Sequence, residues 1–138
     1  MRIVVDTNVL ASAVYFGGKP FKLLKLIMEE QISAIASKEI VEEYEEILVR
    51  LQQKFPKLSK SIPFQDIVGK LTVINVSSDI HICRDPDDDK FISCAVDGKC
   101  IYVVSGDNDL LELKDYEGIE IITVARFFER FDGQSQVK

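Results

Sequence analysis

The chain has 138 residues, of which 46% are hydrophobic and 29% charged, as expected for one globular domain and not for a disordered or two-domain protein. Its net charge of −6, from 17 basic and 23 acidic residues, disfavours sequence-blind attraction to nucleic acid or to an anionic membrane. Three cysteines are too few for a disulfide framework, and no apolar run approaches the ~20 residues of a membrane helix, so we expect a cytoplasmic protein.

Strand and helix patterns alternate through the first half of the chain. Residues 3–5 form a short apolar run that is typical of a strand buried on both faces, and residues 20–30 carry a helical apolar stripe. A second strand is predicted over 32–36, followed by a long helix that Ser37 caps and that reaches Phe55. A helix between residues 56 and 70 then precedes a strand over 71–76.

The same alternation continues in the second half. Asp85 followed by Pro86 predicts a helix start, because an aspartate cap with proline at the first helical position is favoured there. Strands are predicted over 101–104 and 119–122, with a short helix from Asp107 between them and a closing helix through Phe127 and Phe128. This order predicts an α/β fold in which helices cover both faces of a parallel sheet. We assign residues 1–132 to one domain and expect 133–138 to form a flexible tail.

Acidic residues follow two of the predicted strands, at the sheet edge where parallel sheets bind their ligands. Asp6 ends the first strand, where capping of the next helix is an equally good interpretation. Asp107 and Asp109 follow the strand over 101–104. Capping explains one of these two aspartates but hardly both, so this edge of the sheet is the first place to look for function.

A further aspartate, Asp88, lies in the acidic run 85–89. Most of that run complements the dipole of the helix it begins. Asp88 differs because it shares a helical face with Phe91 and Ile92, and a charge on a buried face needs a cation or strong hydrogen bonds. A calcium loop is disfavoured, since Lys90 stands where the EF-hand pattern requires glycine.

A fourth carboxylate can come from the glutamate-rich helix after Ser37. Helical geometry puts Glu43 and Glu45 at the two borders of its apolar stripe, and the pattern does not choose between them. Two carboxylates ~4 Å apart repel by about 4 kcal/mol at a protein surface, so a cluster either raises its pKa values or holds a divalent cation. Oxygen ligands suit Mg²⁺ or Mn²⁺, and such ions promote phosphodiester hydrolysis.

Four segments, in this order, resemble the PIN domain family, most strongly its bacterial and archaeal branch of VapC-like toxin components. The resemblance covers nearly the whole chain. It implies a three-layer α/β/α sandwich with a central parallel sheet, and hence a single PIN domain over 1–132. The segments are Asp6-Thr7-Asn8-Val9-Leu10, Ser37-Lys38-Glu39-Ile40-Val41-Glu42-Glu43-Tyr44, Arg84-Asp85-Pro86-Asp87-Asp88-Asp89-Lys90-Phe91 and Ser105-Gly106-Asp107-Asn108-Asp109-Leu110-Leu111.

By the same resemblance the protein is expected to be a metal-dependent endoribonuclease acting on single-stranded RNA, with Mg²⁺ or Mn²⁺ as cofactor and a cognate antitoxin as partner. Three aspartates are implied as direct or water-mediated ligands, and a glutamate as a further ligand or as the group that orients water. The resemblance favours Glu43 over Glu45 for that glutamate. The implied metal-binding and catalytic residues are Asp6, Glu43, Asp88 and Asp107, with Asp109 as an accessory ligand and Asn8 and Ser105 in support.

RNA binding also requires cations. Lys19, Lys22 and Lys25 share one helix flank and are weak candidates for substrate binding. Arg50, Lys54, Lys57 and Lys60 form a second basic stretch. The ordinary interpretation of both groups of basic residues is that they are solvated surface side chains without a binding role.

Two other functions remain open: a PIN-like module that binds RNA or an antitoxin without cutting, and a PIN nuclease acting on DNA. The chain lacks the helical clamp that flap endonucleases add, which disfavours DNA. A dehalogenase-type phosphatase is disfavoured by Asn8, where that motif requires aspartate, and a zinc site by the lack of a Cys-x-x-Cys pair. Apolar area on the helices is compatible with a homodimer, and no membrane partner is expected.

Overall fold

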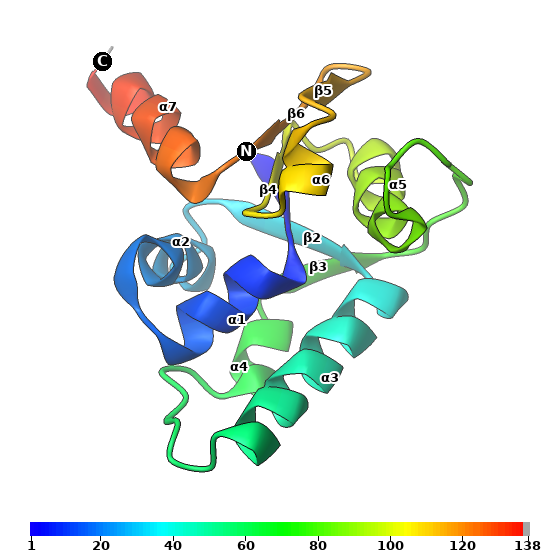
Figure 1. Cartoon of the computed structure of the whole chain (residues 1–138). Helices are drawn as coiled ribbons and strands as arrows, with labels where there is room; N and C mark the ends of the chain where they lie inside the picture. The colour runs from blue at the N-terminus through cyan, green and yellow to red at the C-terminus, as the bar shows by residue number, and fades with distance from the viewer. Residues whose placement is uncertain (137–138) are drawn as a thin grey trace.

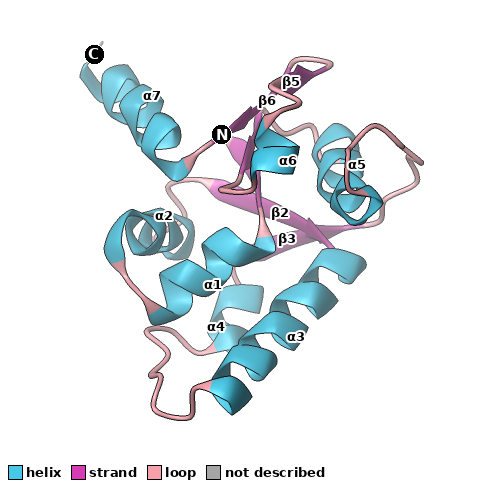
Figure 2. Ribbon diagram, viewed as in Figure 1, coloured by secondary structure: helices cyan, strands magenta, loops and turns pink. Residues whose placement is uncertain are grey.

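The computed structural model describes residues 1–136, which form a six-stranded sheet flanked by helices (Figures 1 and 2). The strand order is β3-β2-β1-β4-β6-β5. Four neighbouring pairs are parallel, and β5 is antiparallel to β6. The strands are β1 (Arg2–Val5), β2 (Ser33–Ser37), β3 (Leu71–Ile74), β4 (Tyr102–Val104), β5 (Asp115–Tyr116) and β6 (Ile119–Ile122).

The helices cover both faces of this sheet, as the alternation predicts. Helix α5 packs against β1, β2 and β4 on one face, while on the other face α1 packs against both α2 and α3 (Figure 1). The helices are α1 (Thr7–Tyr15), α2 (Gly18–Met28), α3 (Lys38–Lys54), α4 (Phe64–Val68), the 3-10 turn η1 (Pro86–Asp88), α5 (Asp89–Asp97), α6 (Asn108–Leu111) and α7 (Val124–Gln136).

The central strands lie in the core. Ile3, Val4, Ile35 and Val103 are completely buried, which confirms the interpretation of the short apolar runs as strands covered on both faces. Because β1 and β4 are parallel neighbours, their carboxyl ends meet at one sheet edge, and the amide of Asp6 donates to the carbonyl of Val104 over 2.9 Å there. This edge carries the predicted site.

The α/β/α fold is confirmed, and the structure differs from the prediction in details. The predicted helix between residues 56 and 70 is confined to α4, and the strand after it ends at Ile74. The hairpin strand β5 has no apolar alternation and was not predicted; its turn uses Gly118 at φ +85°. The expected tail from Gly133 is helical as far as Gln136, and residues 137–138 lie outside the described part. Within residues 1–136, no helix has the length and apolar character of a membrane span.

Candidate active site

Asp6 lies at the start of α1 but does not cap it. Its carboxylate makes no capping hydrogen bond, and instead accepts one from the hydroxyl of Ser105 over 2.7 Å. The side chain is 5% exposed. Burial raises its pKa, and the charges of Asp107 and Glu43 add to that effect while the Ser105 hydrogen bond opposes it. The structure therefore decides between the two sequence interpretations of Asp6 in favour of a buried acid at the sheet edge.

Asp88 ends the η1 turn and is 8% exposed, as its place on the face of Phe91 and Ile92 predicts. Its Oδ2 atom is buried, and no hydrogen-bond partner for it exists among the described residues. Burial raises the pKa of Asp88 to about 7, with further contributions from Asp107 and Asp6. A buried carboxylate oxygen without a partner is costly, and a bound cation would complete it.

Asp107 precedes α6 and caps it. Its Oδ1 accepts the amide of Asp109 over 2.9 Å, and its own amide donates to the hydroxyl of Ser105 over 3.0 Å. The fully buried hydroxyl of Ser105 thus accepts from the backbone of Asp107 and donates to Asp6. One serine therefore joins the two acids that follow the neighbouring strands β1 and β4.

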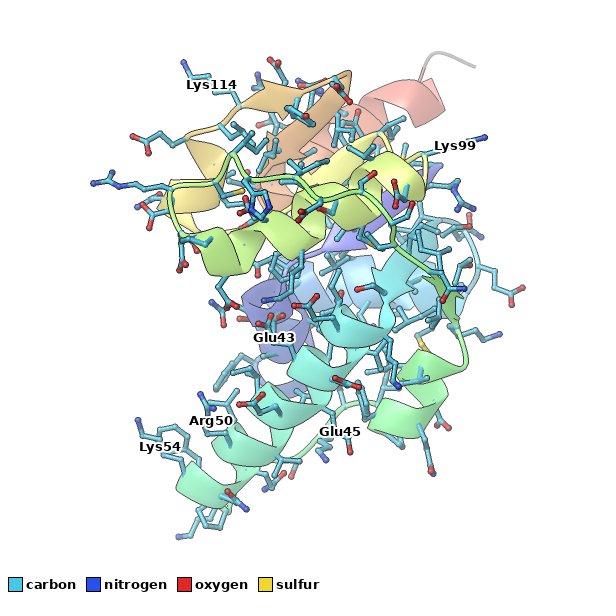
Figure 3. The ribbon with its side chains drawn as sticks, turned by 90° about the vertical axis from the view of Figure 1, so that its right-hand side faces the viewer. Glu43, Glu45, Arg50, Lys54, Lys99 and Lys114 are labelled. Carbon is cyan, nitrogen blue, oxygen red and sulfur yellow. The ribbon has the colours of Figure 1, made fainter. Side chains whose placement is uncertain are left out.

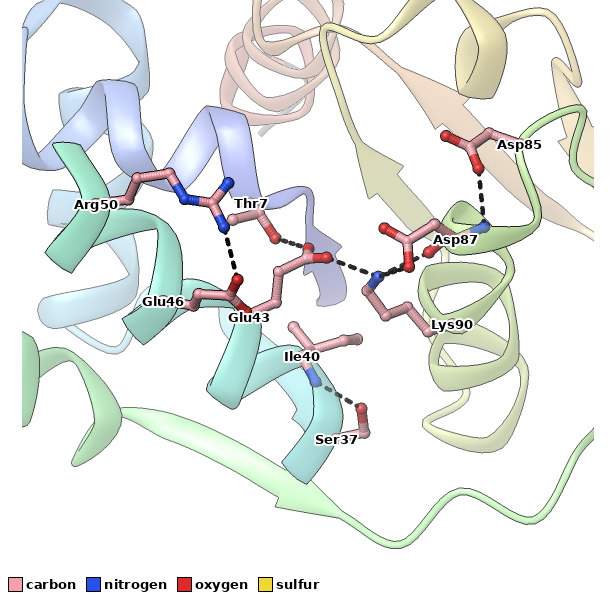
Figure 4. Close-up of polar contacts among 9 residues, drawn as sticks. All are labelled: Thr7, Ser37, Ile40, Glu43, Glu46, Arg50, Asp85, Asp87 and Lys90. Carbon is pink, nitrogen blue, oxygen red and sulfur yellow. Dashed lines mark hydrogen bonds and ion pairs between the residues drawn. The ribbon is translucent and has the colours of Figure 1, made fainter. Parts of the chain in front are cut away.

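Glu43 comes to the same edge from α3. Its carboxylate accepts a hydrogen bond from the hydroxyl of Thr7 and forms an ion pair of 2.7 Å with Lys90 Nζ (Figure 4). The neighbouring Tyr44 hydroxyl donates to the Val5 carbonyl over 2.5 Å, which ties this turn of α3 to the end of β1. Glu45 is exposed and lies on the other side of the helix (Figure 3). The structure therefore brings Glu43, and not Glu45, to Asp6.

Lys90 is one of two site residues that the sequence patterns do not single out. Its side chain is only 7% exposed, and Nζ contacts Glu43 at 2.7 Å and Asp87 at 3.2 Å (Figure 4). It also lowers the pKa of Asp88. The available signal was a lysine directly between an acidic run and the buried Phe91, where a long side chain can extend along apolar surface and bring its charge to the acids. Thr7, which holds Glu43, was also missed.

Other predicted residues lie outside this group. Oδ1 of Asp109 in α6 lies 3.9 Å from Nε of Arg84, which belongs to the loop before η1. Lys19, Lys22 and Lys25 are exposed on α2, and Lys22 Nζ lies 5.8 Å from the Phe128 ring centroid of α7. Within residues 1–136, none of these three lysines forms an ion pair with an acid of the site.

The four acids are gathered but are not arranged as a metal-coordination sphere. As they lie in the described chain, no three side chains from His, Cys, Asp and Glu stand close enough to hold a metal ion. In this arrangement Asp6 is bonded to Ser105, Asp107 to the Asp109 amide, and Glu43 to Thr7 and Lys90. The donor set itself fits Mg²⁺ or Mn²⁺, since every group is a carboxylate and Asp88 Oδ2 has no hydrogen-bond partner within residues 1–136.

Grooves lie on two sides of these acids. One, of about 700 Å³, is lined by Asn8, Ser105, Asp107, Asp109 and Thr123 at the carboxyl ends of β1, β4 and β6. The other, of about 460 Å³, is lined by Ser37, Lys38, His81, Asp87 and Lys90 next to β2 and β3. Asn8 therefore lies in the wall of a groove that reaches Asp107.

Comparison with known proteins places the chain in a family. The PIN domain family matches residues 2–109, so the chain belongs to the PIN domain family. PIN domains are typically nucleases and generally use divalent metals, which makes this chain a hydrolase at the level of its class. A protein of Methanocaldococcus jannaschii with the name "Uncharacterized protein MJ1680" is 32% identical over 149 residues, covering 96% of this chain and 92% of that protein.

Proposed function

We propose that this PIN domain is a Mg²⁺- or Mn²⁺-dependent endoribonuclease that hydrolyses phosphodiester bonds of single-stranded RNA. The observation that carries the proposal is the buried Oδ2 of Asp88, which lies beside Asp6 and Asp107 and has no hydrogen-bond partner in the described part of the chain. Three negative charges in a mostly buried space repel one another, and a divalent cation relieves that repulsion at the edge where substrates of parallel sheets bind. PIN membership supports the nuclease class.

In this proposal each acid has a defined task. Asp6, Asp88 and Asp107 hold the cation, directly or through water, and Ser105 keeps the first of these pointed into the site. Asp109 is an accessory ligand, and it must give up its ion pair with Arg84 to bind the cation. When bound, the cation would supply an activated water and would neutralise the charge that develops on the phosphate.

Glu43 has the remaining task. It is a further ligand, or it accepts a hydrogen bond from the attacking water and orients it, with Thr7 and Lys90 setting the direction of its carboxylate. Asn8 supports the site from the wall of the groove that reaches Asp107. Lys19, Lys22 and Lys25 are weaker candidates for contacts to the phosphates, since they lie on α2 and away from Glu43.

We further propose that the chain is the toxin of a type II toxin–antitoxin pair in the cytoplasm, bound by a cognate antitoxin protein. Support comes from the four sequence segments that resemble this branch of the family. A basic antitoxin segment is the partner that a site with this charge favours, because the chain carries a net −6. Homodimer formation is a part of the same proposal and is checked by the mass of the purified protein in solution.

A second candidate, a PIN-like module that binds RNA or its partner without cutting, is favoured by one observation. Lys90 already neutralises Glu43, so the acids are partly balanced without a metal. A PIN nuclease acting on DNA is the third candidate.

One experiment separates these candidates. Purified protein is incubated with matched single-stranded RNA, single-stranded DNA and duplex RNA in Mg²⁺, Mn²⁺ or EDTA. Metal-dependent cutting of the single-stranded RNA alone supports the proposal. Cutting of DNA, or binding without cutting in every metal, contradicts it.

A further inference from the structure

Two exposed phenylalanines lie together at the far ends of α1 and α3. Phe16 ends α1 with 64% of its surface exposed, and Phe55 ends α3 with 47% exposed. Both line a groove of about 550 Å³ whose remaining walls are Lys54, Pro56, Lys57 and Leu58. Large aromatic rings are seldom left in water without a use, and here two of them share one groove.

The groove is held in shape by hydrogen bonds that join its three parts. Tyr15, next to Phe16, donates to the Leu48 carbonyl of α3 over 2.9 Å. Gln52 of α3 donates to the Leu58 carbonyl over 2.9 Å and to the Pro56 carbonyl over 3.2 Å, so the loop after α3 folds back on the helix. The rings are therefore presented by an ordered framework, which reduces the entropy lost when a ligand stacks on them.

The surroundings of the rings are cationic. Lys54 Nζ lies 5.5 Å from the centroid of the Phe55 ring. Lys54, Lys57 and Lys60 are exposed, and in the described chain none of the three has an ion-pair partner. On a protein with a net charge of −6, aromatic rings beside unpaired cations match a ligand that combines planar bases with a negative backbone.

This surface is connected to the acidic edge by one side of α3. Glu43, Arg50 and Lys54 are spaced by seven and four residues, which puts them on one helical face, and Figure 3 shows them in that order along the helix. Lys54 is about 16 Å along the axis from Glu43. Arg50 is paired with Glu46 in an exposed salt bridge of 2.7 Å, a weak contact that a phosphate can replace.

We propose that Phe16 and Phe55, with Lys54 and Lys57, form a stacking platform for single-stranded RNA, and that the strand runs from it along the Arg50 side of α3 to the acids. The inference rests on the proposed function for its substrate, but it concerns binding and not cutting. The exposed Glu42 borders this path beside Arg50 and repels a strand that leaves it. These four residues make up the platform.

Binding is tested without metal, so that cleavage plays no part. The fluorescence anisotropy of a labelled mixed-sequence RNA of about 12 nucleotides is measured in EDTA with each variant. Phe16→Ala with Phe55→Ala should weaken binding by about tenfold or more, and Phe16→Leu with Phe55→Leu nearly as much, because leucine keeps apolar area but does not stack. Phe16→Tyr with Phe55→Tyr should retain it. Thermal unfolding of each variant verifies that the fold is kept.

The lysines are tested through salt dependence. Lys54→Gln with Lys57→Gln should reduce the slope of log K against log salt by about 1.4, which corresponds to about 0.7 for each phosphate contact to a single strand. Lys99→Gln with Lys114→Gln is the matched control, because these exposed lysines lie at the opposite end of the molecule (Figure 3). An equal change of slope in the control pair would overturn the platform.

Three further results separate the inference from the proposed function. If the alanine pair binds RNA as wild type does, the platform is wrong even where cleavage is metal-dependent. If the alanine pair breaks a dimer in solution and leaves RNA affinity unchanged, the groove is an interface between copies and the platform is again wrong. If wild type binds RNA through the platform but never cuts it, the platform stands and the nuclease proposal falls. With an active enzyme, the alanine pair should lower kcat/KM for the long RNA and leave a dinucleotide substrate unaffected.

Discussion

The ammonium group of Lys90 lies 2.7 Å from a carboxylate oxygen of Glu43, with only 7% of the lysine side chain exposed. It joins α5 to α3 across the carboxyl edge of the sheet and brings a positive charge to a group of acids that otherwise repel one another. Because this charge also lowers the pKa of Asp88, Lys90 occupies in part the electrostatic role that a bound cation would have.

Replacing Lys90 with methionine therefore has two expected effects in opposite directions. The metal-free protein should lose about 1–3 kcal/mol of unfolding free energy, because Glu43 is left without its buried partner. Affinity for Mn²⁺ should rise, because the competing charge is gone. Urea unfolding in EDTA measures the change in stability, and calorimetric titration measures the change in Mn²⁺ affinity. The exposed Lys25→Met is the control for both. Weaker Mn²⁺ binding in Lys90→Met would show that the lysine assists the cation instead of competing with it.

Ser105 is expected to act on catalysis by positioning Asp6. Ser105→Ala removes the 2.7 Å hydrogen bond to Asp6 and the acceptor of the Asp107 amide. Groups that orient metal ligands are typically worth about 10–100-fold in affinity or activity, so cleavage and Mn²⁺ affinity should fall together by that amount. The exposed Ser59→Ala provides the matched control. Unchanged Mn²⁺ affinity in Ser105→Ala would place the serine in a purely structural role.

Glu43 and Glu45 offer a matched pair on one helix. Glu43→Gln should lower kcat by more than about 100-fold, since it removes either a ligand or the group that orients water. Glu45→Gln should leave kcat within about twofold, because Glu45 is exposed on the other side of α3 (Figure 3). Single-turnover cleavage by both variants is the measurement. Equal losses in both would assign the effect to the charge of the helix and not to the position of Glu43.

The raised pKa of Asp88 predicts how stability varies with pH. The native pKa is about 7 and the ordinary value 3.8, so between about pH 4 and 7 the native protein holds a proton that the unfolded chain has lost. In EDTA the unfolding free energy should therefore rise as the pH falls through this window, by at most about 1.4 kcal/mol per pH unit from this group. Asp6, whose pKa is also raised, contributes in the same direction.

Asp88→Asn should flatten that dependence, because asparagine does not titrate, and should raise stability at pH 8. Urea unfolding of wild type and Asp88→Asn between pH 5 and 8 measures the difference, with the exposed Asp66→Asn as control. Mn²⁺ should reverse the trend in wild type, since it requires the ionised carboxylate. If Asp88→Asn keeps the wild-type slope of unfolding free energy against pH, another group is responsible for the pH dependence.

Local patterns in the sequence predicted most of the fold. Ser37 caps α3 through the Ile40 amide at 3.2 Å, and Asp85 caps η1 through the Asp87 amide at 3.0 Å, as the sequence predicts. The helical period also predicts that Asp88 is buried, because it puts Asp88 on the same face as Phe91 and Ile92, and the structure confirms this burial. The two-residue strand β5 was missed because its pairing with β6, and not its own composition, makes it a strand.

No local sequence pattern predicts the contacts that organise the site, because their partners are far apart in the sequence. Asp6 and Ser105 are 99 residues apart, and Lys90 meets Glu43 across 47 residues. Position alone left Asp6 equally suited to capping, and only the structure shows its carboxylate turned to Ser105. The choice of Glu43 over Glu45 came from the family resemblance, and its bond to Thr7 gives that choice a physical basis.

The most direct test of the account follows Asp88 in two assays on the same preparations. Wild type and Asp88→Asn are titrated calorimetrically with Mn²⁺ at pH 8, and both are incubated with mixed-sequence single-stranded RNA in Mn²⁺ or EDTA. We predict that wild type binds Mn²⁺ and cuts the RNA only when metal is present. The variant, equally folded, should bind Mn²⁺ more weakly by at least about tenfold and should not cut. Equal Mn²⁺ binding and equal cutting by Asp88→Asn would contradict the assignment of the site.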